Sequence, residues 1–348
     1  MLPAHCHHRV RVAEQADLTT VRGVAADLAG PGSGAAALGE DVAGRFQLVV
    51  SELATNLLRH ADGGGVILLR RLETIAGVEC IALDQGPGIA DLAAALADRA
   101  DPEPRAGLGL GYGLGAVRRL SERFDIHSET GIGTAVLSRV LARGSEDRGP
   151  PFAWGTVMLA MSGGQHCGDG WLVRPDGLVV AVDGLGHGEA ASIAARRAEA
   201  VAGEAAHGDD PRTVIAAMHD RLRGTRGAVA AVLRLTDRRI DHSSVGNIAM
   251  TIVRRIGATA PTMTALTGRW GVVGYNAAPP PTASAAWEPD DHLILHSDGC
   301  ARLAELFVER RLRHVDPVLA AAVLLRDGGA RVDDQTVIVL RNARRTPP

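Results

Sequence analysis

The chain contains no lysine, and all 37 of its basic residues are arginine. A P-loop needs a lysine to reach the terminal phosphates of a nucleotide, and protein kinases of the eukaryotic type need one on a strand. Both classes are therefore excluded. Aromatic residues make up only 3% of the chain, and the arginines are spread evenly along it. Base-stacking platforms and a concentrated basic surface are both missing, so we expect no nucleic-acid partner.

Cysteine is scarce as well. Four cysteines without paired spacing do not make a disulfide framework in a chain of this length, and reduced thiols in the cytoplasm fit them better. They are Cys6, Cys80, Cys167 and Cys300. We find no apolar signal core and no apolar run of the ~18 residues that span a bilayer, so we expect a cytoplasmic protein without membrane contact. Residues 5 to 8 (His-Cys-His-His) could ligate a metal, but we favour a flexible N-terminus.

A length of 348 residues exceeds one ordinary core and suggests about two domains. Hydrophobic residues are 46% of the chain and charged residues 22%, which is typical of globular proteins. Residues 143 to 151 are polar and rich in glycine and proline between two apolar segments, which is typical of a linker. We therefore predict domains over residues 1 to 142 and 152 to 342, joined by a linker over 143 to 151.

The first half has one strong helical period. Apolar residues recur at helical spacing over residues 41 to 60, and Glu52 and Asn56 lie one turn apart on the other face of this predicted helix. Short apolar runs at 66 to 72 and 78 to 83 predict neighbouring strands, with Asp84 at a strand end. A second helix is predicted over about 114 to 124, followed by two strands around a turn at 131 to 133. The half is thus an α/β sandwich.

These polar residues suit a nucleotide site. The Asn56 amide oxygen can ligate Mg²⁺, and the Glu52 carboxylate can orient an attacking hydroxyl or water. Asp84 can accept a hydrogen bond from the adenine amine, while Gly86 and Gly88 let the chain turn tightly beside the base. A glycine ladder that opens the second helix would offer free amides to phosphate. Its members are Gly107, Gly109, Gly111, Gly113 and Gly115.

The order of these segments resembles a known superfamily. Glu-Leu-Ala-Thr-Asn at 52 to 56, Asp-Gln-Gly-Pro-Gly-Ile at 84 to 89, the ladder, and Gly-Ile-Gly-Thr at 131 to 134 resemble the successive boxes of GHKL ATPases over about residues 10 to 141. Within it they look most like RsbT-type serine-kinase switch proteins and their anti-sigma relatives. The resemblance implies a Bergerat-type sandwich that binds ATP with Mg²⁺. It implies Asn56 as metal ligand, Glu52 as catalytic base, Asp84 as adenine acceptor and Thr134 as a neighbour of the adenine.

The second half has many short strand candidates and fewer helices, which predicts packed antiparallel sheets with helices outside. The predicted strands cover residues 154 to 162, 170 to 174, 177 to 183, 228 to 236, 239 to 254, 292 to 297 and 334 to 341. The predicted helices cover residues 188 to 206, 211 to 222 and 316 to 325. Residues 276 to 289 are rich in proline and alanine and predict a loop.

Carboxylates lie mostly at the ends of these strands, namely Asp169, Asp183, Asp298 and Asp333. If they converge, they could hold two divalent ions that activate a bridging water and clamp a phosphoryl group. Gly184 would let its carbonyl approach a metal. A single Asp-Gly pair usually marks only a turn, so the joint pattern decides.

That pattern resembles the metal-dependent PPM phosphatases. Cys-Gly-Asp-Gly at 167 to 170, the run from 182 to 188, Ser-Asp-Gly at 297 to 299 and Asp-Asp-Gln-Thr at 333 to 336 carry the resemblance over about 152 to 341. Thr-Arg-Gly-Ala at 225 to 228 and Val-Gly-Asn at 245 to 247 point to the SpoIIE and RsbX branch. The resemblance implies an α-β-β-α sandwich with two Mn²⁺ or Mg²⁺. It implies as ligands Asp169, Asp183, Asp298 and Asp333, with Gly184 contributing backbone.

Together the two resemblances imply a bifunctional partner-switching regulator. It would phosphorylate and dephosphorylate serine or threonine on a STAS-domain antagonist or a stressosome-type protein, with a sigma or anti-sigma factor as a further partner. The alternative is a metal-dependent phosphatase whose N-terminal domain binds ATP and a partner, as an anti-sigma or allosteric module, without transferring phosphate.

Overall fold

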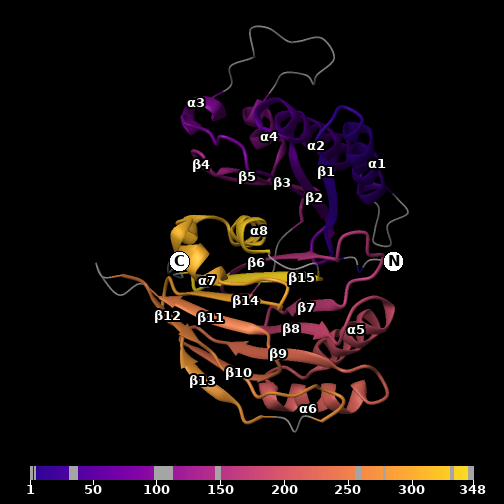
Figure 1. The fold of residues 1–348 in the computed structure, drawn as a ribbon, viewed down its shortest axis with the longest axis vertical. Coiled ribbons are helices and arrows are strands. Elements are labelled where there is room, and N and C mark those ends of the chain that lie inside the picture. Colours follow the sequence, from indigo (N-terminus) through magenta and orange to yellow (C-terminus); the bar gives the residue numbers. More distant parts are fainter. Residues whose placement is uncertain are drawn as a thin grey trace. The chain divides into compact units, whose positions relative to one another are not determined.

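The computed structural model describes residues 3, 5–30, 38–97, 113–145, 150–254, 260–276, 280–329 and 333–343. The chain divides into two compact units (Figure 1). The N-terminal unit is His7–Asp147, and the C-terminal unit combines Met1–Cys6 with Arg148–Pro348. In the described part of the chain, none of the helices has the length and apolar character that a membrane crossing requires.

The N-terminal unit is one antiparallel sheet with its helices packed on one face. The sheet has the strand order β1-β2-β3-β5-β4. Its strands are β1 (His8–Val12), β2 (Gly65–Leu72), β3 (Gly77–Asp84), β4 (Arg123–Glu129) and β5 (Gly133–Leu141). The helices are α1 (Asp17–Ala29), α2 (Glu40–His60), α3 (Leu92–Leu96) and α4 (Gly113–Leu120).

Helix α2 anchors this unit, and its apolar stripe explains why. Phe46, Val49 and Leu53 recur at helical spacing and are almost fully buried in one core with residues of β2, β3 and β5. The predicted helix, both predicted strands and the position of Asp84 at the end of β3 are confirmed. The second predicted helix is too long: α4 ends at Leu120, because Phe124 and its neighbours alternate in a strand.

The expectation of a flexible N-terminus is wrong. Cys6 and His7 are each only 1% exposed. The Nε2 atom of His7 lies 3.0 Å from Oε1 of Glu79, and His8 begins β1, which pairs antiparallel with β2. Alternation of polar residues with Val10 and Val12 is the strand signal that this expectation overlooked. His7 is therefore part of a buried polar network.

The C-terminal unit contains two five-stranded antiparallel sheets, with the orders β13-β10-β9-β8-β7 and β12-β11-β14-β15-β6. The first sheet is built from β7 (Asp169–Val173), β8 (Leu178–Gly184), β9 (Ala228–Leu235), β10 (Arg239–Val245) and β13 (Ala283–Ala286). The second sheet is built from β6 (Ala153–Leu159), β11 (Ala249–Arg254), β12 (Thr262–Ala265), β14 (His292–His296) and β15 (Gln335–Arg341).

Side chains along these strands point alternately to the two faces of each sheet. Each sheet therefore packs on both faces, and the unit has four layers. Residues such as Ala231 of β9 and Leu293 of β14 form the core between the sheets. The outer face of the first sheet packs against α5 (Glu189–Glu204) and α6 (Pro211–Leu222). Helix α8 (Pro317–Gly328) packs against β6 and β15 of the second sheet. The expected order of helix, sheet, sheet and helix is confirmed (Figure 1).

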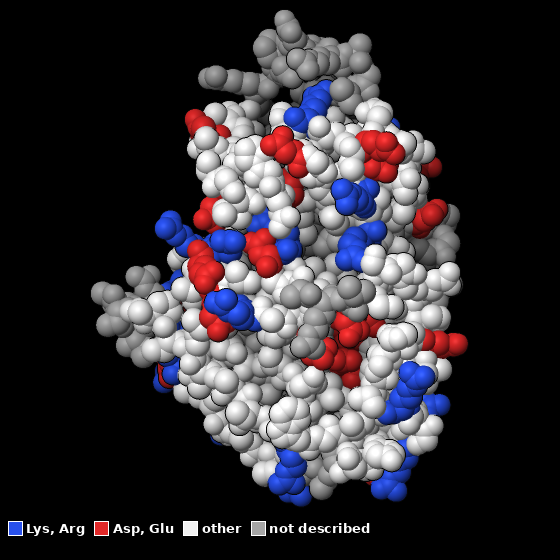
Figure 2. All heavy atoms as spheres, in the orientation of Figure 1, with Lys and Arg blue, Asp and Glu red and all other residues white. Residues whose placement is uncertain are grey.

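Three details of this unit differ from the sequence predictions. The predicted strand over 239 to 254 is two strands in different sheets, because the chain turns at Gly246, whose φ is +101°. The predicted loop over 276 to 289 contains β13, and a helix α7 (Leu303–Glu309) was not predicted. On the face shown in Figure 2, acidic side chains gather over β7 and β8.

Candidate functional sites

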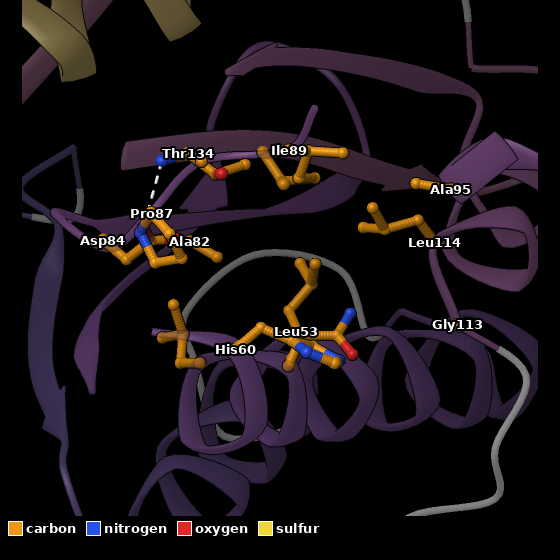
Figure 3. A pocket seen from close by; sticks show the side chains of 14 residues that line it. Leu53, His60, Ala82, Asp84, Pro87, Ile89, Ala95, Gly113, Leu114 and Thr134 are labelled. Atoms are coloured by element: carbon orange, nitrogen blue, oxygen red, sulfur yellow. Dashed lines mark hydrogen bonds between the residues drawn. The ribbon is translucent and has the colours of Figure 1, made fainter. Parts of the chain in front are cut away.

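The N-terminal unit has a cavity of about 450 Å³ between α2 and the sheet (Figure 3). Its wall is mostly apolar, with polar groups from Asn56, His60, Asp84 and Thr134. Leu114 of α4 closes it from the side. A mainly apolar cavity of this size with a few convergent polar groups is typical of a small-molecule site.

Asp84 is held in one orientation at the cavity wall. Its Oδ1 accepts hydrogen bonds from the backbone amides of Gly86, at 2.8 Å, and Thr134, at 3.1 Å. The Thr134 hydroxyl lies 2.9 Å from that of Ser128. The turn itself needs a glycine at position 88. The φ of Gly88 is +72°, and a Cβ at this position would lie only 2.4 Å from the Glu129 carbonyl oxygen. A fixed carboxylate of this kind can accept from an amine of a bound base.

Glu52 and Asn56 of α2 have different surroundings. Asn56 lines the cavity, whereas Glu52 is not among the lining residues and is only 6% exposed. Oε2 of Glu52 accepts a hydrogen bond of 3.3 Å from the amide of Gly113, where α4 begins. Asn56 therefore suits a Mg²⁺ ion carried by a nucleotide in the cavity, because amide oxygens are ligands for hard cations.

The structure describes two residues of the glycine ladder, Gly113 and Gly115. Gly113 lines the cavity, while Gly115 is buried inside α4 away from it. Gly86 does not line the cavity either and instead positions Asp84. The predicted ligands Gly107, Gly109 and Gly111 lie outside the described residues. His60 also lines the cavity.

In the C-terminal unit, strands from both sheets bring the predicted acids together. Asp169 and Asp183 are directly opposite each other in the pairing of β7 with β8. Oδ2 of Asp169 accepts from the Ser297 hydroxyl at 2.8 Å, and Ser297 connects β14 to Asp298. Asp298 in turn accepts from Nδ2 of Asn247 at 3.2 Å. We call Asp169, Asp183, Asp298, Asp333 and Asp334 the acid cluster.

Burial and mutual repulsion dominate the electrostatics of this cluster. Burial and the carboxylates of Asp169 and Asp298 together raise the pKa of Asp183 to about 8. Burial also raises the pKa of Asp169 to about 7, and the hydrogen bond from Ser297 opposes this shift. The charged neighbours that cause these shifts are carboxylates. A bound cation would therefore stabilise the ionised forms of the cluster.

The adjacent acids Asp333 and Asp334 have different surroundings. Asp334 is 5% exposed, and its two oxygens accept from the amides of Met161, at 2.7 Å, and Gly168, at 2.6 Å. These bonds brace the segment that leads into Asp169. The bracing role of Asp334 and the Ser297 contact were missed by sequence reasoning, although the adjacent acids were a visible signal. Asp333, which is less buried, stays the predicted ligand of the pair.

The donor set fits hard divalent cations. Carboxylates and a backbone carbonyl are ligands that Mg²⁺ and Mn²⁺ prefer. Gly184 lets the end of β8 lie close to α5, because a Cβ at this position would lie 2.3 Å from the Ala191 carbonyl oxygen. Within the described ranges, no three acidic, histidine or cysteine side chains are close enough to hold an ion unaided. Water and the Gly184 carbonyl would therefore complete the coordination, as is usual for Mg²⁺.

The cysteines beside the acids are unsuited to metal binding or nucleophilic attack. A hydrogen bond with Cys6, burial and the nearby Asp169 charge all raise the pKa of the Cys167 thiol. Burial raises the pKa of Cys300 to about 12. Both side chains therefore remain protonated thiols at neutral pH, whereas ligands and nucleophiles are thiolates.

Comparison with known proteins identifies both domains. A model of the histidine kinase-like ATPase domain matches residues 12–139, and a model of stage II sporulation protein E (SpoIIE) matches residues 176–342. The serine/threonine-protein kinase RsbT of Bacillus subtilis (strain 168) is 35% identical over 97 residues, which are 26% of this chain and 67% of RsbT. The chain joins an RsbT-like ATPase domain to a SpoIIE-type phosphatase domain. The N-terminal unit is its ATPase domain, of GHKL type, and the C-terminal unit its phosphatase domain, of PPM type.

Solved structures also resemble the chain. One, described as "The bacterial stressosome: a modular system that has been adapted to control secondary messenger signaling", is 30% identical and covers 55% of this chain and 99% of its own, with a TM-score of 0.47. RsbX in complex with magnesium is 21% identical and covers 53% of this chain and 92% of its own, with a TM-score of 0.44. The family assignment rests on the two family models and on RsbT.

Proposed function

We propose that the chain both adds phosphate to a partner protein and removes it. The ATPase domain would phosphorylate a serine or threonine on a STAS-domain antagonist or stressosome-type protein, and the phosphatase domain would reverse this, so that a sigma or anti-sigma factor is switched. The observation that carries the proposal is that one chain has a nucleotide-sized cavity with an oriented Asp84 and also a cluster of acids whose charges raise the pKa of Asp183. The names of RsbT and of the stressosome structure support the choice of partner.

The kinase step would use residues of α2. ATP would lie in the cavity with its amine on Asp84, and Mg²⁺ on Asn56 would neutralise charge on the phosphates. Glu52 would take the proton of the partner's hydroxyl. The oxygen of this hydroxyl would bond to the γ-phosphorus as ADP leaves. The contact of Glu52 with the Gly113 amide supports such a role, because it ties this carboxylate to the helix that follows the glycine ladder.

The phosphatase step would use the acid cluster. Two Mn²⁺ or Mg²⁺ ions supply a metal-activated water when bound. The cluster would hold them through Asp169, Asp183, Asp298, Asp333 and the Gly184 carbonyl. Oxygen of that water would bond to phosphorus as the serine or threonine oxygen leaves and takes up a proton. Ser297, Asn247 and Asp334 would keep the carboxylates in place through the hydrogen bonds already described.

Mass spectrometry tests both steps on one sample. Candidate STAS-domain proteins are incubated with the full chain and Mg-ATP, then freed of nucleotide and given Mn²⁺. We expect one phosphate to be gained in the first step and lost in the second. A partner set that gains nothing and, when phosphorylated by other means, loses nothing would contradict the proposal.

A second function is favoured by one observation, namely that Glu52 does not line the cavity. The ATPase domain would then bind ATP and a partner without transferring phosphate, and only the phosphatase domain would be an enzyme. Glu52→Gln and Asp84→Asn separate the two. Transfer that is lost in both variants, with ATP binding lost only in Asp84→Asn, supports the kinase. ATP binding without partner phosphorylation in the wild type supports the binding module, whereas partner phosphorylation that persists in Glu52→Gln contradicts the role of Glu52 as base.

A further inference from the structure

The loop over residues 268 to 276 carries two aromatic rings in solvent. Trp270 is 85% exposed and Tyr275 is 81% exposed, whereas the other three tryptophans pack against the core between the sheets. The chain is poor in aromatics, at 3%. Tryptophan and tyrosine dominate the energetically important positions of protein interfaces, so their exposure together on one loop marks a recognition surface.

Backbone hydrogen bonds hold this loop in place, whereas the rings of Trp270 and Tyr275 are exposed. The Arg269 amide donates to the Ser244 carbonyl at 2.9 Å, and the Arg269 carbonyl accepts from the Gly246 amide at 2.8 Å. Val273 exchanges two backbone hydrogen bonds with Ala228, at 3.1 and 2.8 Å, and its side chain is buried. The rings are thus presented by a preorganised loop, which lowers the entropy cost of binding.

Both attachment points lead directly to the acid cluster. Gly246 is followed by Asn247, which donates to Asp298. Ala228 is preceded by Gly227, whose carbonyl accepts at 3.0 Å from the amide of Leu185, two residues after Asp183. Leu185 is itself 45% exposed. The loop therefore borders the predicted metal site on two sides.

Positive charge accompanies the rings. Arg226 and Arg269 are exposed, and within the described residues neither guanidinium makes a hydrogen bond or an ion pair. A Cβ placed on Gly186 would lie 3.1 Å from Nη1 of Arg226, so this guanidinium lies beside the segment that follows Asp183. A guanidinium at this place can form paired hydrogen bonds with a phosphate group.

We propose that the 268 to 276 loop and Arg226 form the surface that selects the phosphorylated protein substrate. This inference rests on the proposed phosphatase function. Trp270 and Tyr275 would contact apolar residues that flank the phosphoserine or phosphothreonine, and Arg226 would pair with the phosphate as it enters the acid cluster. The substrate class is thus a phosphoprotein whose modified residue lies next to apolar side chains. Selection would not depend on the metal ligands themselves.

Two phosphoserine peptides test this surface with the full chain and Mn²⁺. One has leucine and valine on both sides of the phosphoserine, and the other has serine and glycine there; para-nitrophenyl phosphate is the reference substrate. We expect the wild type to prefer the apolar peptide in kcat/KM by about tenfold or more, and the Trp270→Ala, Tyr275→Ala double variant to lose this preference, mainly through KM. Met263→Ala is the matched control, because Met263 is 43% exposed on β12 outside this loop. It should keep the preference.

Arg226→Ala should raise KM for both peptides alike, since the phosphate is common to them. A wild type without peptide preference, or a double variant that keeps it, would overturn the inference while phosphatase activity on the reference substrate stands. A wild type that hydrolyses none of the three substrates would instead overturn the proposed phosphatase function, and this inference with it.

Discussion

Two groups of buried acids in this chain have opposite electrostatics. In the ATPase domain, Glu79 is fully buried between Arg70 and Arg139, with each arginine Nε 2.6 Å from one of its oxygens, and His7 at 3.0 Å. Burial alone would raise the pKa of Glu79, but the two arginines and the histidine outweigh it and hold the pKa well below its usual range. In the phosphatase domain, burial and neighbouring acids raise the pKa of Asp183 to about 8.

This difference indicates that Glu79 has a structural role, whereas the acid cluster around Asp183 is a candidate binding site. The register of β3 with β2 and β5 places Arg70 and Arg139 directly opposite Glu79, so the sheet neutralises its own buried charge. Around Asp183, by contrast, the charges of Asp169, Asp298, Asp333 and Asp334 add to the effect of burial and raise its pKa. Repulsion among acids of this kind is typical of sites that bind a cation.

The largest expected effect is on catalysis. Asp183→Ala removes a predicted ligand from the acid cluster, and we expect Mn²⁺-dependent hydrolysis of para-nitrophenyl phosphate to fall by at least ~100-fold. Asp327→Ala is the control, because Asp327 is a partly buried acid that Arg310 and Arg326 neutralise. Metal-dependent turnover that survives in Asp183→Ala would show that the cluster is not the site.

The next effect is on the stability of the ATPase domain. Glu79→Gln leaves two buried arginines without their counter-charge, which should cost about 3–5 kcal/mol of unfolding free energy. Hydrogen exchange of the β2, β3 and β5 amides measures this loss. The pair of Glu122 with Arg45, in which the Glu122 side chain is 41% exposed, provides the comparison, and Glu122→Gln should cost less than ~1 kcal/mol. Equal costs would mean that the neutralised group contributes no more than a surface pair.

The pH dependence of stability has opposite signs in the two groups. The folded phosphatase domain keeps a proton on Asp183 up to about pH 8, whereas the unfolded chain loses it near the ordinary value of 3.8. The folded state thus binds more protons across this window, so stability in a metal chelator should fall as pH rises through it. Asp183→Asn should flatten this fall. Tryptophan fluorescence during urea unfolding measures it, because all four tryptophans belong to the phosphatase domain.

For Glu79 the sign is reversed. Its folded pKa is depressed, so its contribution to stability is complete above the usual glutamate range and is lost as the pH falls through the folded pKa. The ATPase domain should therefore lose protection of its sheet amides in acid, and Glu79→Gln should lose less over the same range. An identical acid dependence in wild type and variant would contradict the assignment of this charge.

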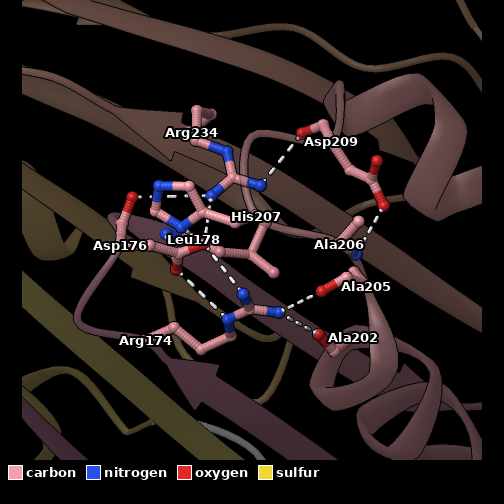
Figure 4. Close-up of polar contacts among 9 residues, drawn as sticks. All are labelled: Arg174, Asp176, Leu178, Ala202, Ala205, Ala206, His207, Asp209 and Arg234. Carbon is pink, nitrogen blue, oxygen red and sulfur yellow. Dashed lines mark hydrogen bonds and ion pairs between the residues drawn. The ribbon is translucent and has the colours of Figure 1, made fainter.

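The smallest effect concerns a third acid, Asp176, which is neutralised like Glu79 (Figure 4). Arg174 and Arg234 each place a nitrogen 2.8 Å from its Oδ2, and Arg174 also donates to the carbonyls of Ala202 and Ala205 at the end of α5. Arg174→Ala should cost about 1–3 kcal/mol of phosphatase-domain stability without changing the Mn²⁺ affinity. A change in Mn²⁺ affinity would mean that this network reaches the acid cluster.

Sequence reasoning succeeded where one pattern determines one structure. The apolar stripe of α2 and the short apolar runs of β2 and β3 were sufficient, because each buries a single face in a core. It failed where a turn is hidden in an apolar run, as at Gly246 between β10 and β11. It also failed at His7, whose burial depends on cross-chain partners such as Glu79 that have no signature near residue 7.

The candidate sites show the same division. Motif order brought out Asp84, Asp169 and Asp183, since each closes or opens a strand whose apolar run is visible. The bracing bonds of Asp334 to Met161 and Gly168 could not be foreseen, because they join segments more than 160 residues apart. Neither could the exposure of Trp270, which depends on how its loop is attached.

Calorimetric titration of Mn²⁺ into the full chain tests most directly the claim that the acid cluster forms a metal site. At a pH near 7, the wild type should bind Mn²⁺ and release protons, because Asp169 and Asp183 must ionise on binding. Asp183→Asn should bind at least ~100-fold more weakly, while Glu79→Gln, if it remains folded, should bind as the wild type does. Wild-type affinity in Asp183→Asn would contradict the account.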